Sequence, residues 1–225
     1  MNRALFLIII GLGGAAILVS LGLWQVQRLG WKQDIIAGIE ARIFAAPVTL
    51  PAVADRDADA YLPVVVSGEF SGDTLRVLVS QKETGAGYRL ITAFETEGRR
   101  IMIDRGFIPV EDNNMATPQS RVEVIGNLQW PQESDGFTPD PDLDRNIWFA
   151  RDVPAMAGFL QTEPLLIVAR KLSQDGSGVT PLPVDTNRIP NDHLQYAITW
   201  FSLAAIWLAM SVLFLRRRRG TKSES

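Results

Sequence analysis

Two long apolar stretches, 4–27 and 193–215, frame 165 residues of mixed polarity. A helix rises about 1.5 Å per residue, so each stretch is long enough to cross a hydrocarbon core of about 30 Å. A helix also satisfies its own backbone hydrogen bonds in lipid, which an isolated strand cannot do. The pattern therefore predicts a membrane protein with two transmembrane helices and one domain, 28–192, between them.

The basic residues beside the two spans predict the orientation of the protein. The N-terminal tail, 1–3, carries one basic residue, and the C-terminal tail, 216–225, carries Arg216–Arg219 and a lysine. Because short cytoplasmic tails are enriched in Lys and Arg, we expect both termini in the cytoplasm of a bacterium. The domain 28–192 is then periplasmic, at the inner membrane. A cleaved signal peptide is the competing interpretation of the first stretch, but its apolar run is too long and no A-x-A-like site ends it.

Within the domain, the hydrophobic pattern changes from a helical to a strand-like period. Residues 33–45 have isoleucines at helical spacing and end before Pro47, which predicts a first helix of the domain. From Leu62 onward the apolar runs are short, and turn residues separate them too closely for crossover helices, so we expect antiparallel hairpins. A short helix, 152–160, is predicted with Asp152 as its cap. The predicted strands are 64–70, 75–81, 88–95, 100–109, 121–130 and 165–171.

These elements predict a membrane α + β fold, in which two transmembrane helices flank one extracytoplasmic, antiparallel β-rich domain. Six or seven strands in a domain of this size favour a barrel-like arrangement, either a partly closed barrel or a strongly curved sheet with helices at its ends. Gly106 lies within one strand-like run. Since glycine is a poor strand residue, it indicates a bulge or a close backbone approach at that position.

Charge and composition exclude several classes of function. The domain holds sixteen basic and twenty-four acidic residues, a net charge of about −8, which argues against nucleic acid as a partner. The chain has no cysteine and one histidine, His193, so thiol catalysis, disulfides and Cys/His metal sites are excluded within it. Because the only imidazole lies at a membrane edge, we expect no enzymatic activity and assign no catalytic residue.

A glycine-rich segment, Gly11–Gly14, lies inside the first span. A nucleotide-binding loop of similar composition requires a strand before it and a helix after it, and this segment has neither. We interpret it as a helix-packing surface, in which Gly11 and Ala15 face Ala205 and Ala209 of the second span.

The second span begins with polar and aromatic residues that fall on one helical stripe. A flat aromatic ligand can lie along this stripe. The imidazole then coordinates its iron, the alanines leave room for it, and the first tryptophan packs on one of its rings. The alternative is an interfacial belt, where amphipathic rings prefer to lie. Position alone leaves both interpretations open. The stripe consists of His193, Tyr196, Ala197, Trp200, Ala204 and Trp207.

Seven segments, in order along nearly the whole chain, match the signature of a known family. They are Leu21–Lys32, Tyr61 with Gly68–Phe70, Gly87–Tyr88, Ile103–Pro109, Gly126–Leu128, Trp148–Asp152 and Pro190–Phe201. On these segments the chain resembles the surfeit locus protein 1 family. It departs from the family in having Phe107 where tryptophan is frequent, an aromatic exchange that keeps the packing.

That family consists of membrane assembly factors, or chaperones, for haem-copper cytochrome c oxidase of the respiratory chain. Its bacterial members are implicated in binding haem a and helping it reach the catalytic subunit. The resemblance therefore implies His193 as an axial ligand of the haem iron. We expect Tyr196, Trp200 and Trp24 to line the cofactor, and Arg28 to pair with a propionate. For Arg28 the alternative is a snorkelling anchor at the membrane interface.

The resemblance also implies the partners. Haem a is the expected cofactor, bound transiently. Cytochrome c oxidase subunit I and haem a synthase are the expected protein partners, beside the lipid bilayer. The alternative function is a membrane-tethered scaffold that stabilises an oxidase assembly intermediate without binding haem, and the sequence leaves this choice open.

Overall fold

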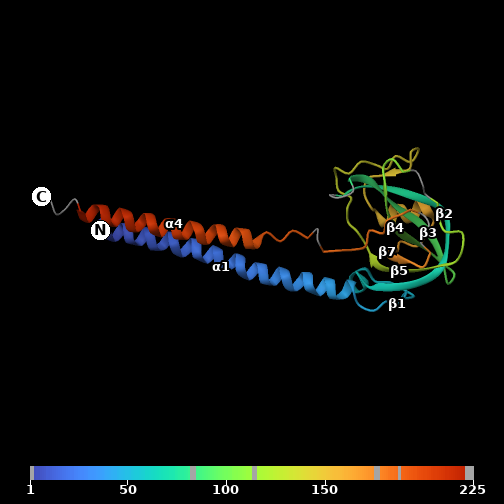
Figure 1. Cartoon of the computed structure of the whole chain (residues 1–225), viewed down its shortest axis with the longest axis horizontal. Helices are drawn as coiled ribbons and strands as arrows, with labels where there is room; N and C mark the ends of the chain where they lie inside the picture. The colour runs from blue at the N-terminus through green and yellow to red at the C-terminus, as the bar shows by residue number, and fades with distance from the viewer. Residues whose placement is uncertain (1–2, 82–84, 113–115, 175–177, 187–188, 221–225) are drawn as a thin grey trace. The chain divides into compact units, whose positions relative to one another are not determined.

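A computed structural model describes residues 3–81, 85–112, 116–174, 178–186 and 189–220 (Figure 1). The chain divides into two compact units, a helical one formed by 1–38 with 186–225, and a β-rich one formed by 39–185. The ends of the predicted tails, 1–2 and 221–225, lie outside the described residues. The elements are α1 (Arg3–Ile43), β1 (Val48–Thr49), α2 (Arg56–Asp59), β2 (Pro63–Gln81), β3 (Gly85–Thr96), β4 (Arg99–Pro109), β5 (Val122–Gln129), β6 (Ile147–Trp148), α3 (Val153–Leu160), β7 (Leu166–Leu172) and α4 (His193–Gly220).

Helices α1 and α4 are both long and apolar enough to cross a membrane, and they mark the chain as a membrane protein. They contain the two predicted spans and flank the sheet domain, which confirms the predicted fold class. The prediction of a separate helix at 33–45 was wrong, because α1 continues through this segment to Ile43. Between the first span and Pro47 the glycines are Gly30 and Gly38, and a single glycine inside a helix is tolerated.

Five strands of the β-rich unit close into a barrel. β2 pairs with β3 and β3 with β4, both antiparallel, and β4 pairs with β7 in parallel. β7 pairs with β5, and β5 returns to the first part of β2, both antiparallel. The prediction of hairpins was correct for β2, β3 and β4. It was wrong for β5, because β7 inserts between β4 and β5.

One strand, β2, takes part in both sides of the closure. The sequence predicted two strands here, 64–70 and 75–81, but β2 runs from Pro63 to Gln81 with a register shift between Phe70 and Thr74. Gly72, at a φ of +75°, lies in this bulge. A bulge bends a strand without ending it, so the first half of β2 pairs with β5 and the second half with β3.

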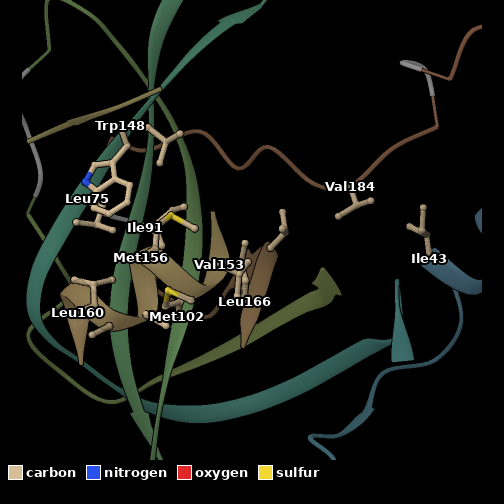
Figure 2. Packing of buried hydrophobic residues seen from close by; sticks show 14 residues of the cluster. Ile43, Leu75, Ile91, Met102, Trp148, Val153, Met156, Leu160, Leu166 and Val184 are labelled. Carbon is tan, nitrogen blue, oxygen red and sulfur yellow. The ribbon is translucent and has the colours of Figure 1, made fainter. Parts of the chain in front are cut away.

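Both faces of the sheet are packed. On β4, Met102 belongs to one hydrophobic cluster, while its neighbours Ile101 and Ile103 belong to another. Successive side chains of a strand point to opposite faces, so these clusters lie on opposite sides of the sheet. Figure 2 shows the first cluster, in which α3 packs its apolar residues on the strands. The members that α3 contributes are Val153, Met156, Ala157 and Leu160.

Helix α3 begins as the sequence predicts. The Asp152 side chain accepts a hydrogen bond from the backbone N–H of Ala155 at 3.1 Å, and a proline stands in the first turn. The carboxylate satisfies one of the donors that a helix N-terminus leaves unpaired.

The last residues of α1 belong to the β-rich unit. Ile43 is 1% exposed, and its carbonyl oxygen accepts hydrogen bonds from Asn127 Nδ2 at 3.0 Å and from Arg170 Nη1 at 3.2 Å. Donors and positive charge are favourable at a helix C-terminus, where carbonyl groups lack partners within the helix. The C-terminus of α1 is thus bound to β5 and β7 by side chains.

A buried ionic network joins the strands to the loop before α3. Asp104 has no exposed surface, and it pairs with Arg89 and, at 3.5 Å, with Arg151. Arg151 also pairs with Glu133 at 2.5 Å. Burial on its own raises the pKa of Glu133, but the hydrogen bonds and charge of Arg151 outweigh it and hold that pKa below its usual value. Since breaking a buried pair leaves an uncompensated charge, this network fixes the loop to the barrel.

Arg105 points away from this network. Its side chain is buried, and it donates a hydrogen bond to the carbonyl of Ala116 and lies 5.4 Å from the ring centroid of Phe70. Burial lowers the pKa of Arg105 to about 10.

Gly106 occupies a bulge in β4, as its residue type indicates. Leu90 pairs with Gly106 while Ile91 pairs with Asp104, so one residue of β4 is unpaired between them. The φ of Gly106 is +125°, and a Cβ atom there would overlap the carbonyl oxygen of Thr180. Both the backbone conformation and the close approach require glycine.

Replacing Gly106 by Val should therefore unfold the β-rich unit at a lower temperature. The strain and overlap should lower the free energy of unfolding by about 3 kcal/mol or more, measured by thermal and denaturant unfolding of the purified full chain. Gly136→Val is the matched control, because a Cβ atom there meets nothing within 4 Å. If Gly106→Val unfolds like the control, the bulge is not a structural requirement.

Candidate functional site

The helical unit is built on a face of small residues along α1. Gly11, Ala15 and Gly22 recur at helical spacing on this face and are buried, as is Gln25 at its end. In Figure 1, α1 and α4 run side by side. Small residues allow the backbones of two membrane helices to approach closely, and the resulting van der Waals contacts favour their association in lipid.

Large side chains of α4 fill this face. Trp207 donates a hydrogen bond from Nε1 to the carbonyl oxygen of Gly11 at 3.0 Å. A Cβ atom at Gly14 would lie 2.6 Å from the same nitrogen, and one at Gly22 would lie 2.7 Å from the ring of Phe201. Because Gly14 and Gly22 have no side chains, they leave the space that the rings of Trp207 and Phe201 occupy.

The prediction that Ala205 and Ala209 face the glycines was wrong, since both are exposed. The buried alanines of α4 are Ala197 and Ala204. The bulky ring of Trp207 and its hydrogen bond set the rotation of α4, and they turn this second pair of alanines toward α1.

At the other end of the same stripe, His193 meets Gln25. The distance between His193 Nδ1 and Gln25 Oε1 is 2.8 Å. Gln25 is 8% exposed and His193 is partly buried. Gln25 pairs with the first residue of α4, whereas Gly11 pairs with Trp207, so the two helices are antiparallel. The N-terminus of α1 and the C-terminus of α4 therefore lie at the same end of the helix pair.

The chemistry of this contact specifies the state of the imidazole. An amide oxygen only accepts hydrogen bonds, so Nδ1 of His193 must carry a hydrogen. In a neutral ring, Nε2 then has the lone pair. Within the part of the chain that the structure describes, no hydrogen bond to Nε2 is found. In this tautomer, Nε2 is the ring nitrogen that can act as a ligand.

The other predicted cofactor residues are dispersed around this pair. Tyr196 is 55% exposed and Trp24 is 54% exposed, while Trp200 is partly buried. The guanidinium carbon of Arg28 lies 3.8 Å from the centroid of the Trp31 ring on the same helix. The structure therefore places Arg28 in a cation–π contact with Trp31.

The expected space for a flat ligand along the stripe is closed. Ala197 is 2% exposed and Ala204 is 4% exposed. Both lie between the His193 and Trp207 contacts, so α1 covers them. A macrocycle that binds His193 must therefore lie at the edge of the hairpin and not along the stripe.

The β-rich unit has a cleft of about 620 Å³ whose lining includes Trp130, Glu133, Arg151 and Pro164. The guanidinium of Arg151 is held there by Glu133 and by Gln129 Oε1 at 3.0 Å. Its donors are thus used within the domain, and we interpret the cleft as a consequence of the ionic network. Among the described residues, no group of three or more His, Asp or Glu side chains can hold a metal ion.

Sequence reasoning missed Gln25. It lies within a segment that resembles the family, but the pattern of the sequence assigns it no role. A signal was present, because Gln25 follows Gly22 by three residues and Gly11 by fourteen, which places its amide on the small-residue face. A polar side chain on the packed face of a membrane helix is costly without a hydrogen-bonding partner, and His193 is the partner of Gln25.

Comparisons with known proteins agree on one relationship. The profile of the SURF1 family matches residues 12–205. Surfeit locus protein 1 of Homo sapiens is 34% identical over an alignment of 229 residues, gaps included. The alignment covers 90% of this chain and 74% of the human protein. The SURF1-like protein of Rickettsia felis is 28% identical over 212 residues, covering 89% of this chain and 92% of the relative. Surfeit locus protein 1 of Rattus norvegicus is 31% identical over 88% of this chain and 71% of the relative.

The packing of Trp207 can be tested with neighbouring glycines. Gly14→Leu should separate α1 from α4, whereas Gly13→Leu should not, because nothing lies within 4 Å of a Cβ atom at Gly13. The chain lacks cysteine, so a pair introduced at Gly11 and Ser211 reports helix contact by disulfide yield. A Cβ atom added at Gly11 would lie 3.1 Å from the Cβ atom of Ser211. Equal yields in the two leucine variants would contradict the assigned interface.

Proposed function

Because the chain belongs to the SURF1 family, we propose that it is an assembly factor for haem-copper cytochrome c oxidase that carries haem a to the catalytic subunit. The proposed role is that of a chaperone, without catalysis. The observation that carries it is the Gln25–His193 pair, which offers an imidazole nitrogen at the edge of a lipid-facing hairpin.

The donor set fits one axial bond to haem iron. Neutral imidazole is a common haem ligand, and the partner of its second nitrogen determines its orientation. His193 is the only histidine of the chain, so one molecule supplies one imidazole. A second imidazole ligand would have to come from another chain, and five-coordinate binding suits a carrier that must release its cargo.

The surroundings of His193 suit the two chemical parts of haem a. Its long hydrocarbon tail favours lipid, which the exposed apolar surface of α1 and α4 faces. Trp24 on α1 and Tyr196 on α4 are exposed and supply aromatic surface, and Trp200, one turn after Tyr196 on α4, is partly buried. The propionates need water or cations, and Arg28 can exchange its contact with Trp31 for a carboxylate.

The proposed location is a bacterial inner membrane, with both termini in the cytoplasm and the β-rich unit in the periplasm. The antiparallel pairing of α1 and α4 supports placing both termini on one side, and the basic run Arg216–Arg219 supports the cytoplasmic side. Subunit I of cytochrome c oxidase, as recipient, and haem a synthase, as donor, are the partners that this role requires.

Haem binding is tested by replacing His193 with Gly in a strain that makes haem a. The variant should insert and fold, because the residue lies at a span edge, but it should bind haem a about 10- to 100-fold more weakly. Added imidazole should restore the Soret band. Gln195→Ala, an exposed position of the same helix, is the control. Unchanged haem content in His193→Gly would favour the scaffold that binds no haem.

Topology is tested with a reporter that is active only in the periplasm. Inserted at the exposed residue Gly136, it should be active, and fused after the C-terminus, it should be silent. The opposite pattern would place the β-rich unit in the cytoplasm and remove the proposed partners.

A further inference from the structure

The contact between Gln25 and His193 gives a role to a residue outside the ligand itself. We propose that Gln25 is a positioning residue, which holds His193 in the tautomer that carries its hydrogen on Nδ1 and its lone pair on Nε2. The inference rests on the proposed haem-carrier function for what Nε2 binds. The tautomer itself is a property of the haem-free protein.

The position of Gln25 suits this task. Its side chain lies on the packed face of α1, three residues after Gly22, and it is 8% exposed. Rotamer freedom is small in such a place, so the amide oxygen stays directed at Nδ1, 2.8 Å away. Gln27 and Gln195 lie two residues from Gln25 and His193 on the same helices, but both are exposed, and the partner of the imidazole Nδ1 is Gln25.

The hydrogen bond selects between two nearly equivalent tautomers. Which ring nitrogen carries the hydrogen is determined by the partner of the other one. Without Gln25, a hydrogen on Nε2 would block that nitrogen as a ligand. With Gln25, the ring is held with Nε2 unprotonated before the ligand arrives, so binding costs neither a tautomer change nor a rotation of the ring.

An amide also limits the strength of the bond that forms. A carboxylate partner draws the Nδ1 hydrogen and makes imidazole a stronger ligand. An uncharged amide oxygen orients the ring with less effect on its basicity. The choice of glutamine therefore favours a ligand that is ready to bind and also ready to release.

The single histidine allows a direct test in the full-length, haem-free protein. Labelling with ¹⁵N-histidine, on protein purified through a tag without histidine, gives the signals of one imidazole, and the two ring nitrogens report their protonation separately. At a pH where the ring is neutral, the unaltered protein should show the hydrogen on Nδ1. Gln25→Leu should shift the population to Nε2, and Gln27→Leu should leave it unchanged. A hydrogen on Nε2 in the unaltered protein, or no shift in Gln25→Leu, overturns the inference.

Haem titration of the same variants connects the tautomer to binding. Gln25→Leu should weaken haem a binding about 10- to 100-fold, with Gln27→Leu as the control. Gln25→Glu keeps an acceptor oxygen, so unlike Gln25→Leu it should bind haem a as tightly as the unaltered protein does. It should also move the reduction potential of the bound haem to a more negative value. Equal affinity in Gln25→Leu and the unaltered protein overturns the positioning role.

The helix contact must be measured in parallel. The disulfide yield of cysteines at Gly11 and Ser211 should stay unchanged in Gln25→Leu, which separates a lost hydrogen bond from a lost hairpin. A yield that falls with affinity would make Gln25 a packing residue and overturn the inference. If the unaltered protein binds no haem but shows the Nδ1 tautomer, the proposed function fails while the assignment of the hydrogen bond holds.

Discussion

The register between α1 and α4 is the constraint on which the candidate site depends. Trp207 lies against Gly14 and donates to the carbonyl of Gly11. Gln25 follows Gly11 by fourteen residues, and Trp207 follows His193 by fourteen. These equal intervals, about 21 Å along each helix, mean that a register fixed at the tryptophan brings the amide and the imidazole together at the other end. Trp207, about four turns along α4 from His193, thus determines the geometry of the pair at the other end.

The same close packing limits where a ligand can bind. Glycines let α1 approach α4, and this approach covers Ala197 and Ala204. A looser pair of helices would leave a slot for a macrocycle between them but would lose the contact that orients His193. The structure has the oriented imidazole and no slot. On the proposed function, the cargo then stays at the lipid-facing edge, from which transfer to another membrane protein requires no separation of the helices.

The sequence predicted what local patterns determine. The length of the apolar stretches predicted the two spans, and the pattern of apolar and turn residues predicted most of the strands. Asp152 indicated the start of α3, and Gly106 indicated the bulge in β4. It could not give contacts between distant segments. The parallel pairing of β7 with β4 and the ion pairs of Asp104 join residues up to 64 positions apart, and Gln25 and His193 are 168 apart. The residues of the predicted stripe on α4 have different surroundings, since Ala197 and Ala204 are buried while Tyr196 is exposed. Which of them face α1 depends on the position of a partner helix, which periodicity does not identify.

Different interactions stabilise the β-rich unit and the pair of helices. Burial of apolar side chains on both faces of the barrel stabilises the unit in water, and the paired charges around Asp104 attach a loop to it. In lipid that apolar driving force is absent, so close packing and hydrogen bonds hold the helices. A buried amide between them is costly without a partner and useful with one. Gln25 meets this requirement with the only imidazole of the chain. On the proposed function, the hydrogen bond that satisfies the helix pair therefore also orients the ligand.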